Sequence, residues 1–288
     1  MKIAIHSNNL DMSVALAETL KSRLKDTSFV FDSSTPDVVV SIGGDGTMLS
    51  AFHKYEHLLE TTRFVAVHTG HLGFYTDFVA QQIDDLIAFL KNVTHYGDVS
   101  YPLLSVQYSD KNGQHDQLAL NEMTLKTISG TLVCEVYIND DLFEVFRGDG
   151  ICLSTPTGST AISKSLGGAV LHPGLDAMQL TEMTALNNTV YRTIGSPLIL
   201  PASDRVKLVI KRAITPVMVI DNFEPYFIDM ENTKEIVITL SHQRVYFKDF
   251  KNIDFWKRVE SAFIGEIDRE ALSVKPTRRK YNFVKLEK

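Results

Sequence analysis

Apolar and polar positions in the first hundred residues alternate between two kinds of pattern. Short apolar runs at 2–5, 37–42 and 63–68 are typical of strands, and the β-branched run at 37–42 is typical of a strand buried on both faces of a parallel sheet. Apolar stripes at helical spacing lie between and after these runs, and one such helix is predicted from Thr47 to Tyr55. This alternation predicts a Rossmann-like α/β domain over residues 1–100.

The pattern changes near Tyr101, where the apolar residues begin to follow strand spacing. Turn residues at 111–113 and 139–141 predict two hairpins, and 165–200 is expected to be an irregular stretch. Further short strands are predicted at 206–210, 217–220, 236–240 and 245–247. Several short strands with turns between them predict an all-β domain, a β-sandwich, over residues 101–250.

The chain ends with one more helix and a polar segment. Phe255, Val259 and Phe263 fall on one helical face, so a helix is expected within 251–264, packing back on the N-terminal domain. Residues 265–288 are polar and without periodicity, and we expect them to form a flexible tail.

Composition narrows the class of protein. The 288 residues are 44% apolar and 22% charged, which is typical of a globular protein with a sizeable core. The formal charge of −6 argues against nucleic-acid and anionic-membrane partners, so a phosphorylated substrate requires a local cluster of donors. Only Cys134 and Cys152 occur, and the sequence has neither a signal-peptide pattern nor an apolar run of membrane-span length. We therefore expect a cytoplasmic protein.

The clearest candidate site is the turn Gly43-Gly44-Asp45-Gly46-Thr47, which follows a buried strand and precedes a helix. Glycines there allow a ligand to approach the backbone, and a helix start aims N–H groups at phosphate. Asp45 is a candidate base or metal ligand, and Thr47 a candidate helix cap. The turn matches neither the Walker A loop nor G-x-G-x-x-G, so its spacing alone leaves an ordinary tight turn equally open.

Two later segments also place polar chemistry among apolar residues. Asn121 and Glu122 lie inside a strand-like run, so alternation turns them to opposite faces and places one of them in unfavourable surroundings. The segment 147–168 begins with Arg147 and Asp149 and then gathers six Ser or Thr residues between positions 154 and 163. Such hydroxyls bind sugars or phosphates, but they also form ordinary Ser/Thr turns.

The three segments together resemble the NAD kinases. That family has a GGDGT loop in an α/β domain, an Asn-Glu pair roughly 75 residues later, and a GDG…STPTGSTAY stretch in a β-domain. The corresponding residues here are 43–47, 121–122 and 148–162, and the resemblance covers about residues 1–264. Stretches 68–77 and 191–201 resemble the Gram-positive members. The departure is Ile162, which stands where the family has Tyr and removes a stacking surface.

The resemblance implies transfer of a phosphoryl group from ATP or inorganic polyphosphate to the 2′-hydroxyl of the adenosine ribose of NAD, giving NADP. It implies that Asp45 is the catalytic acid–base residue and that a divalent cation, Mg²⁺, binds with the donor phosphates. It implies a homotetramer or homodimer as well. The implied phosphate loop consists of Gly43, Gly44, Gly46 and Thr47. The implied NAD contacts are Asp45, Gly46, Phe74, Tyr75, Asn121, Glu122, Arg147, Asp149, Thr160, Ala161, Ile162, Ser163, Lys164, Ser165 and Thr184.

Two other function classes compete with this interpretation. A lipid or sugar kinase with the same GGDG loop is one, although this acidic chain lacks the basic or apolar surface expected of a lipid kinase. A non-catalytic NAD-binding sensor is the other, but a pure binder has no need of the acid Asp45.

Overall fold

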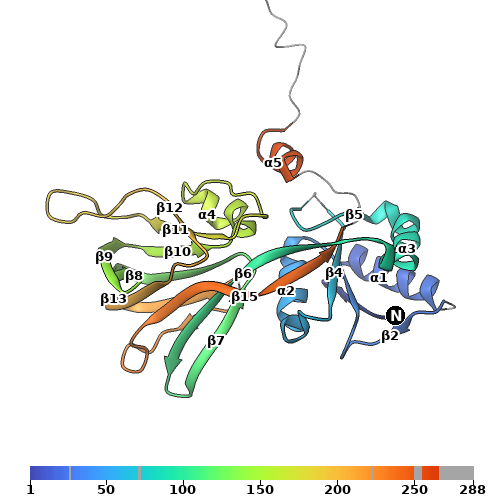
Figure 1. The fold of residues 1–288 in the computed structure, drawn as a ribbon, viewed down its shortest axis with the longest axis horizontal. Helices are drawn as coiled ribbons and strands as arrows, with labels where there is room; N and C mark the ends of the chain where they lie inside the picture. The colour runs from blue at the N-terminus through green and yellow to red at the C-terminus, as the bar shows by residue number, and fades with distance from the viewer. Residues whose placement is uncertain (26, 71–72, 222, 250–254, 266–288) are drawn as a thin grey trace, which may run out of the picture.

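The structure is a computed structural model that describes residues 1–25, 27–70, 73–221, 223–249 and 255–265. Its N-terminal part is a parallel sheet with strand order β2-β1-β3-β4, covered by helices (Figure 1). The strands are β1 (Lys2–Ser7), β2 (Val30–Phe31), β3 (Val38–Ile42), β4 (Arg63–His68) and the short β5 (Phe78–Val79). The helices are α1 (Asp11–Leu24), α2 (Asp45–Tyr55) and α3 (Ile83–Lys91), with 3₁₀ turns η1 (Glu56–Leu58), η2 (Ala80–Gln82) and η3 (Val93–His95).

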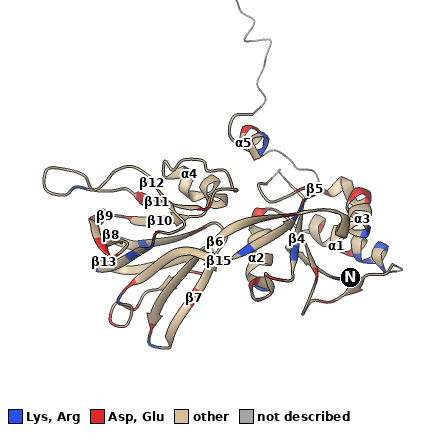
Figure 2. Cartoon of the chain, in the orientation of Figure 1, with Lys and Arg blue, Asp and Glu red and all other residues tan. Residues whose placement is uncertain are grey.

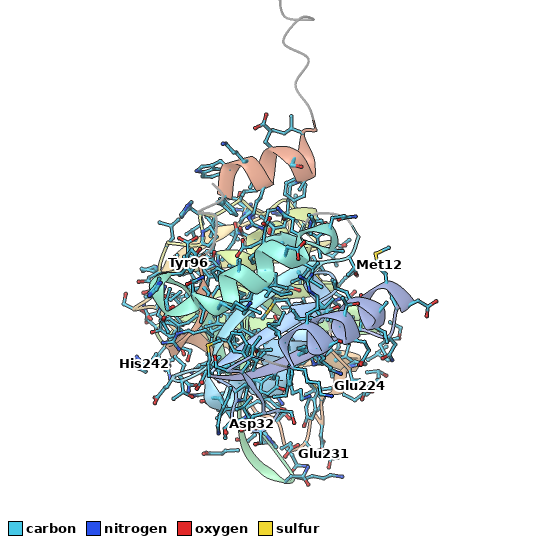
Figure 3. All side chains as sticks on the ribbon, turned by 90° about the vertical axis from the view of Figure 1, so that its right-hand side faces the viewer. Met12, Asp32, Tyr96, Glu224, Glu231 and His242 are labelled. Carbon is cyan, nitrogen blue, oxygen red and sulfur yellow. The ribbon has the colours of Figure 1, made fainter. Side chains whose placement is uncertain are left out.

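The helices cover both faces of this sheet. Seen from their side, α1 and α3 lie next to each other in front of the strands, with the exposed Met12 at the outer end of α1 (Figure 3). Leu20 of α1 and Leu90 of α3 pack with Val40 of β3 in one apolar cluster. The opposite face of the sheet is covered by α2, because Phe52 of α2 packs there with Val39 of β3. The two-sided burial predicted for 37–42 is confirmed.

The second part consists mostly of strands, as expected. They are β6 (Asp98–Asp110), β7 (Gly113–Ala119), β8 (Glu122–Ile138), β9 (Asp141–Gly148), β10 (Gly150–Ser154), β11 (Ala177–Met183), β12 (Leu198–Pro201), β13 (Val206–Ile220), β14 (Tyr226–Phe227) and β15 (Ile236–Lys248). A 3₁₀ turn η4 (Thr157–Thr160) and the short helix α4 (Ile162–Ser165) follow β10. Both predicted hairpins, β6–β7 and β8–β9, are present and antiparallel.

The strands of the two parts form one hydrogen-bonded network. β15 continues the antiparallel series and also runs parallel to β4, where Phe247 is paired with Phe64. An apolar cluster crosses this junction, since Phe52 of α2 packs in the same cluster as Leu120 and Val245 of the second part. The junction therefore holds α2, whose first residue is Asp45, firmly against the β-rich part.

Three details of the secondary structure differ from the prediction. The stretch 165–200 is not wholly irregular, because it contains β11 and β12; the buried polar residues Gln179 and Thr181 conceal the apolar pattern of β11. The strands predicted at 206–210 and 217–220 are one strand, β13, whose pairing with β8 shifts register near Arg212. Those at 236–240 and 245–247 are likewise one strand, β15, with a register shift between Leu240 and Arg244.

The last described element is α5 (Phe255–Phe263), which lies over the loop that follows β4 (Figure 1). Its buried Arg258 donates to the carbonyls of Gly73 and Thr76 at 3.1 and 2.5 Å and pairs with Asp77 at 2.5 Å. The predicted tail lies almost entirely outside the described residues.

Lys, Arg, Asp and Glu are interspersed over both parts of the chain (Figure 2). None of the described helices is long and apolar enough to cross a bilayer.

Candidate active site

The glycine turn joins the carboxyl end of β3 to the first residue of α2. A Cβ atom on Gly43 would lie 2.1 Å from Thr47 Oγ1, so the turn requires glycine at this position for packing. A Cβ on Gly44 or Gly46 would meet no described atom within 4 Å. Because the first amides of a helix lack intrahelical partners, this open surface presents N–H groups to a ligand.

Asp45 is the first residue of α2, and its carboxylate is held in a fixed position. The amide of Phe74 donates to Oδ2 at 2.9 Å, and the amide of Tyr75 donates to Oδ1 at 3.2 Å. Gly73 makes this approach possible, since a Cβ there would lie 2.2 Å from Oδ1. The loop after β4 thus lies directly against the acid of the glycine turn.

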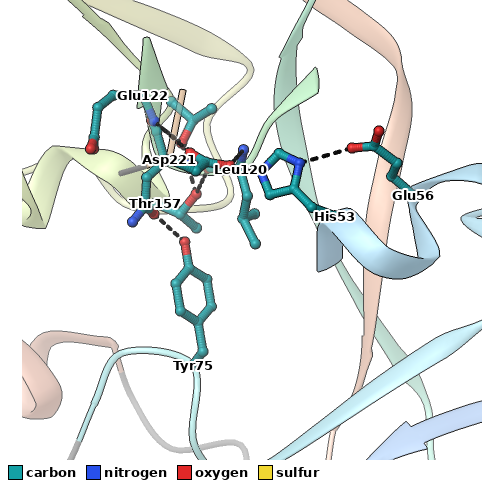
Figure 4. Close-up of polar contacts among 9 residues, drawn as sticks. His53, Glu56, Tyr75, Leu120, Glu122, Thr157 and Asp221 are labelled. Atoms are coloured by element: carbon teal, nitrogen blue, oxygen red, sulfur yellow. Dashed lines mark hydrogen bonds and ion pairs between the residues drawn. The ribbon is translucent and has the colours of Figure 1, made fainter. Parts of the chain in front are cut away.

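Tyr75 connects this loop to the second part of the chain. Its hydroxyl donates to Oδ1 of Asn121. Figure 4 shows this hydroxyl pointing toward the segment of Leu120 and Glu122. The ring is buried and stacks on Phe247 with centroids 5.8 Å apart. Burial holds the pKa of the hydroxyl well above its usual range, so Tyr75 remains a hydrogen-bond donor. Tyr75 therefore contacts Asp45 through its backbone amide and the predicted Asn-Glu pair through its side chain.

The Asn-Glu pair lies at a bend between β7 and β8. Asn121 is outside both strands and Glu122 is the first residue of β8, which corrects the prediction that both are inside a strand. The bend is shaped by the carboxylate of Asp221, which follows β13. Oδ2 accepts from the amide of Leu120 at 2.7 Å, and Oδ1 accepts from those of Asn121 and Glu122 at 2.7 and 3.0 Å (Figure 4). These bonds hold three consecutive amides, so the backbone turns sharply there and leaves the strand direction.

Glu122 has the unfavourable surroundings that strand alternation predicted for one residue of the pair. It is buried, and its Oε2 has no hydrogen-bond partner among the described residues. Burial first, and the negative charge of Asp221 second, raise the pKa of Glu122 to about 8. At neutral pH the side chain is therefore a neutral carboxylic acid that can donate a hydrogen bond.

The hydroxyl-rich segment packs closely on this bend. A Cβ on Gly158 would lie 2.0 Å from the carbonyl oxygen of Asn121, so only glycine fits there. Thr155 Oγ1 and Thr157 Oγ1 both donate to the carbonyl of Leu120, at 2.7 and 2.9 Å. Much of this hydroxyl chemistry is therefore internal, and the turn interpretation describes these residues better than direct ligand binding does.

Two predicted residues have hydroxyls that are engaged inside the protein. Ser163 is fully buried, and its hydroxyl accepts from Gln179 Nε2 at 2.9 Å, while its place among the NAD contacts stays a prediction. Thr47 does not cap α2, because Gly44 occupies the N-cap position and Thr47 Oγ1 accepts from Asn8 Nδ2 at 3.3 Å. In both cases a buried hydroxyl is satisfied by a neighbouring side chain that is distant in the sequence.

The remaining predicted residues fall into two places. Thr160 ends η4, Ala161 is the turn residue after it, and α4 contains the other three; all are at least partly exposed: Thr160, Ala161, Ile162, Lys164 and Ser165. Arg147, Asp149 and Thr184 lie elsewhere, at the opposite end of β10. There the amide of Asp149 donates to the carbonyl of Met183 at 3.0 Å. Because Ser154 at the other end of β10 is paired with Glu122, about 13 Å of strand separates this group from the bend.

A cavity of about 470 Å³ opens beside Phe74 and Tyr75. Thr157 and His172 line it on one side, and Phe255 of α5 contributes to its wall. Volumes of this order are typical of small-molecule sites. The Phe74 ring is turned toward α5, stacking on Phe263 with centroids 5.7 Å apart.

Sequence reasoning missed Asp221 and His53. His53 lies on α2 and contacts Asp221, with Nε2 and Oδ2 2.9 Å apart. Asp221 has one local signal, a carboxylate directly after the apolar strand end of β13, but its partners are about 100 residues away along the chain. The only sequence signal of His53 is its position among the apolar residues of α2.

An α/β layer that delivers a glycine turn and an acid to a helix start, facing a buried amide–acid bend, defines a phosphate-binding protein of the nucleotide-handling class. The comparisons with known proteins narrow this class. Residues 4–99 match the ATP-NAD kinase N-terminal domain, and residues 120–249 match the ATP-NAD kinase C-terminal domain. The chain belongs to the NAD kinase family, and so to the phosphotransferases with an alcohol group as acceptor.

Individual NAD kinases are similar to this chain in sequence or in fold over most of its length. The NAD kinase of Lactobacillus acidophilus is 47% identical over 267 residues, which are 92% of this chain and 98% of that protein. The NAD kinase of Geobacillus stearothermophilus is 47% identical over 265 residues, with coverage of 91% and 96%. The crystal structure of yeast NADH kinase complexed with NADH shares the fold, with a TM-score of 0.78 at 19% identity over 93% of this chain and 88% of that one. An NAD kinase from Archaeoglobus fulgidus in complex with ATP has a TM-score of 0.70 at 22% identity, with coverage of 90% and 97%.

Proposed function

We propose that this protein phosphorylates the 2′-hydroxyl of the adenosine ribose of NAD and that Asp45 accepts the hydroxyl proton. One observation carries the assignment of Asp45. Its carboxylate is fixed by the amides of Phe74 and Tyr75, and the Tyr75 side chain reaches Asn121. The acid therefore lies beside the open glycines on one side and, through a single residue, next to the bend that would hold the nucleoside.

Phosphoryl transfer depends mainly on positioning and on neutralising charge, and this site has groups for both. The open turn at Gly44 and Gly46 supports binding of donor phosphates by the first amides of α2. Asn121 can orient a ribose hydroxyl, and the neutral Glu122 can donate to one. Thr160, Ala161, Ile162, Lys164 and Ser165 extend the nucleotide surface along α4 in this proposal.

The protein side chains near Asp45 fit a divalent cation whose ligands are mostly phosphate oxygens of ATP or polyphosphate. Among the described residues, no group of three or more His, Cys, Asp or Glu side chains could hold a metal ion. Mg²⁺ commonly binds through one or two carboxylates together with phosphates and water, and Asp45 is a carboxylate beside the open turn. When bound, the ion would neutralise the charge of the transferring phosphoryl group.

Arg147, Asp149 and Thr184 are a separate proposal, because they lie at the other end of β10. The Arg147 guanidinium carbon lies 4.3 Å from the centroid of the Tyr191 ring. If NAD binds there, Arg147→Ala should weaken NAD binding in a calorimetric titration. An unchanged Kd would remove this group from the NAD contacts.

We also propose a cytoplasmic location and a homodimer or homotetramer. Cys134 and Cys152 are buried free thiols, which supports a reducing compartment. Large apolar side chains are exposed around β12, including Val190 and Ile199, which supports a contact between copies of the chain. Sedimentation equilibrium of the purified protein would test the assembly.

The decisive experiment incubates the purified full chain with NAD, Mg²⁺ and either ATP or polyphosphate, in parallel reactions. We expect NADP to form with at least one donor, detected by an NADP-specific dehydrogenase. Absence of NADP with both donors would overturn the proposed function. Comparison of the two rates would also identify the preferred donor.

A further inference from the structure

His53 is positioned as a charged residue between two carboxylates. Its Nε2 lies 2.9 Å from Oδ2 of Asp221, and its Nδ1 lies 3.0 Å from Oε2 of Glu56 (Figure 4). A carboxylate oxygen accepts a hydrogen bond, and a histidine ring can donate from both nitrogens only when it is protonated. Burial of the ring opposes this charge, but the bonds to Asp221 and Glu56 outweigh it and raise the pKa of His53 to about 9.

Asp221 is at the centre of this arrangement. Its side chain is fully buried, and it accepts from three consecutive backbone amides as well as from His53. Its own amide donates to the carbonyl of Glu122 at 3.0 Å. A buried carboxylate that loses a charged partner is left uncompensated, so removing His53 should disturb the bend as well as the pair.

The pair connects the two halves of the proposed site at a point away from the ligand. Asp45 begins α2, and His53 follows eight residues later on the same helix, about 12 Å along its axis. Asp45 and the bend are also connected near the ligand, through Tyr75. Two separate connections between α2 and the bend fix both the distance and the angle between Asp45 and Asn121.

We propose that His53 and Asp221 are positioning residues for phosphoryl transfer, which hold the Asp45 helix and the Asn121–Glu122 bend in the relative placement that the reaction needs. This inference rests on the proposed function. The charged groups facing the His53 ring among the described residues are Asp221 and Glu56, and aromatic edges of Phe52 and Phe223 enclose it. The neighbouring Lys54 is directed elsewhere, over the ring of Tyr55. A neutral ring has one N–H instead of two, so deprotonation loosens the connection.

The test compares His53→Gln with His57→Gln, which changes an exposed histidine four residues away. Misplacement of a reacting group by about 1 Å costs up to ~100-fold, so we expect His53→Gln to lower kcat by about 10- to 100-fold. His57→Gln should remain near wild type. Thermal melts of both variants confirm that they are folded at the assay temperature.

The pH profile separates positioning from general stability. Ionisation of Glu122 should lower kcat near pH 8 in both proteins; in the wild type, kcat should fall further as the pH rises through about 9, and only this second fall should be missing in His53→Gln. Glu56→Gln removes one of the two charges that stabilise the imidazolium, so it should move the fall to lower pH. A wild-type kcat in His53→Gln, or a fall that Glu56→Gln does not move, would overturn the positioning role alone. Failure of the wild type to form NADP would overturn the proposed function as well.

Discussion

The Gly43–Thr47 turn and the Leu120–Glu122 bend carry the two acids of the proposed site, but they are built in opposite ways. The turn is open, because a Cβ atom on Gly44 or Gly46 would have no described atom within 4 Å. The bend is closed, because Asp221 and the hydroxyls of Thr155 and Thr157 use its backbone groups. The turn can therefore offer backbone amides to a ligand, whereas the bend can offer only the side chains of Asn121 and Glu122.

This contrast suits the turn and the bend to different parts of the proposed reaction. An open backbone at a helix start is suited to the charged and variable geometry of phosphates. A closed backbone with two fixed side chains is suited to recognising one particular hydroxyl group. Four substitutions test this division, and the one with the largest expected effect comes first.

The catalytic acid of the turn gives the largest effect. Asp45→Asn should lower turnover by at least ~100-fold, as loss of a general base does, while the Kd for NAD stays within about tenfold. Steady-state kinetics and calorimetric titration measure the two quantities, and Asp85→Asn, at an exposed position on α3, is the control. Turnover close to wild type would make Asp45 a structural residue that only orders the 74–75 loop.

A methyl group on the closed side should damage folding. Gly158→Ala places a Cβ 2.0 Å from the carbonyl oxygen of Asn121, so the unfolding free energy should drop by about 2 kcal/mol, as overpacking does. Gly97→Ala is the matched control, because a Cβ there meets no described atom within 4 Å. Urea denaturation compares the two variants. Equal stability would show that the bend is less closed than its contacts indicate.

The same change on the open side should spare folding and reduce activity. Gly46→Ala lies in the first turn of α2, where alanine is at least as favourable as glycine, so stability should be retained. The added methyl group meets the approaching phosphates, and kcat/KM for the donor should fall about tenfold, which is ~1.4 kcal/mol. Unchanged donor kinetics would place the phosphates away from this turn.

The fourth test is the pH dependence of stability that Glu122 causes. Its pKa is about 8 in the folded chain and 4.5 as a free side chain, so between these values the folded state binds more protons than the unfolded one. Stability should therefore fall by up to about 1.4 kcal/mol per pH unit as the pH rises from about 5 to 8, and Glu122→Gln should remove this fall. Denaturation at a series of pH values measures it. Identical slopes in both proteins would mean that Glu122 is ionised and has an unidentified partner.

The sequence predicted the parallel layer, both hairpins and the glycine turn because each leaves a local signal. The β-branched run before Gly43 and the turn residues at 111–113 are examples. It did not predict β11, because that strand buries Gln179 and Thr181 against polar partners such as Ser163. It also divided β13 and β15, since a register shift interrupts an apolar pattern without ending the strand.

The residues of the proposed site also divide into those that the sequence could predict and those that it could not. Asp45, Asn121 and Glu122 could be singled out from the sequence, since a carboxylate among glycines or a polar pair in an apolar run is visible locally. Asp221 and His53 could not, because their importance comes from contacts across 101 and 168 positions of the chain. The cap role of Thr47 was predicted incorrectly for the reverse reason, because a residue type does not show whether a partner already satisfies its hydroxyl.

The succession of an α/β part and a β-rich part, the glycine turn with its acid and the resemblance to a family follow from the sequence alone. These depend on periodicity and on short motifs, which are local properties of a chain. The closing of the bend by Asp221, its connection to α2 through His53, and the position of Arg147 and Asp149 at the far end of β10 follow only from the folded chain. Hydrogen bonds and charge depend on distance in space, and the folding of β13 and β15 brings distant positions together.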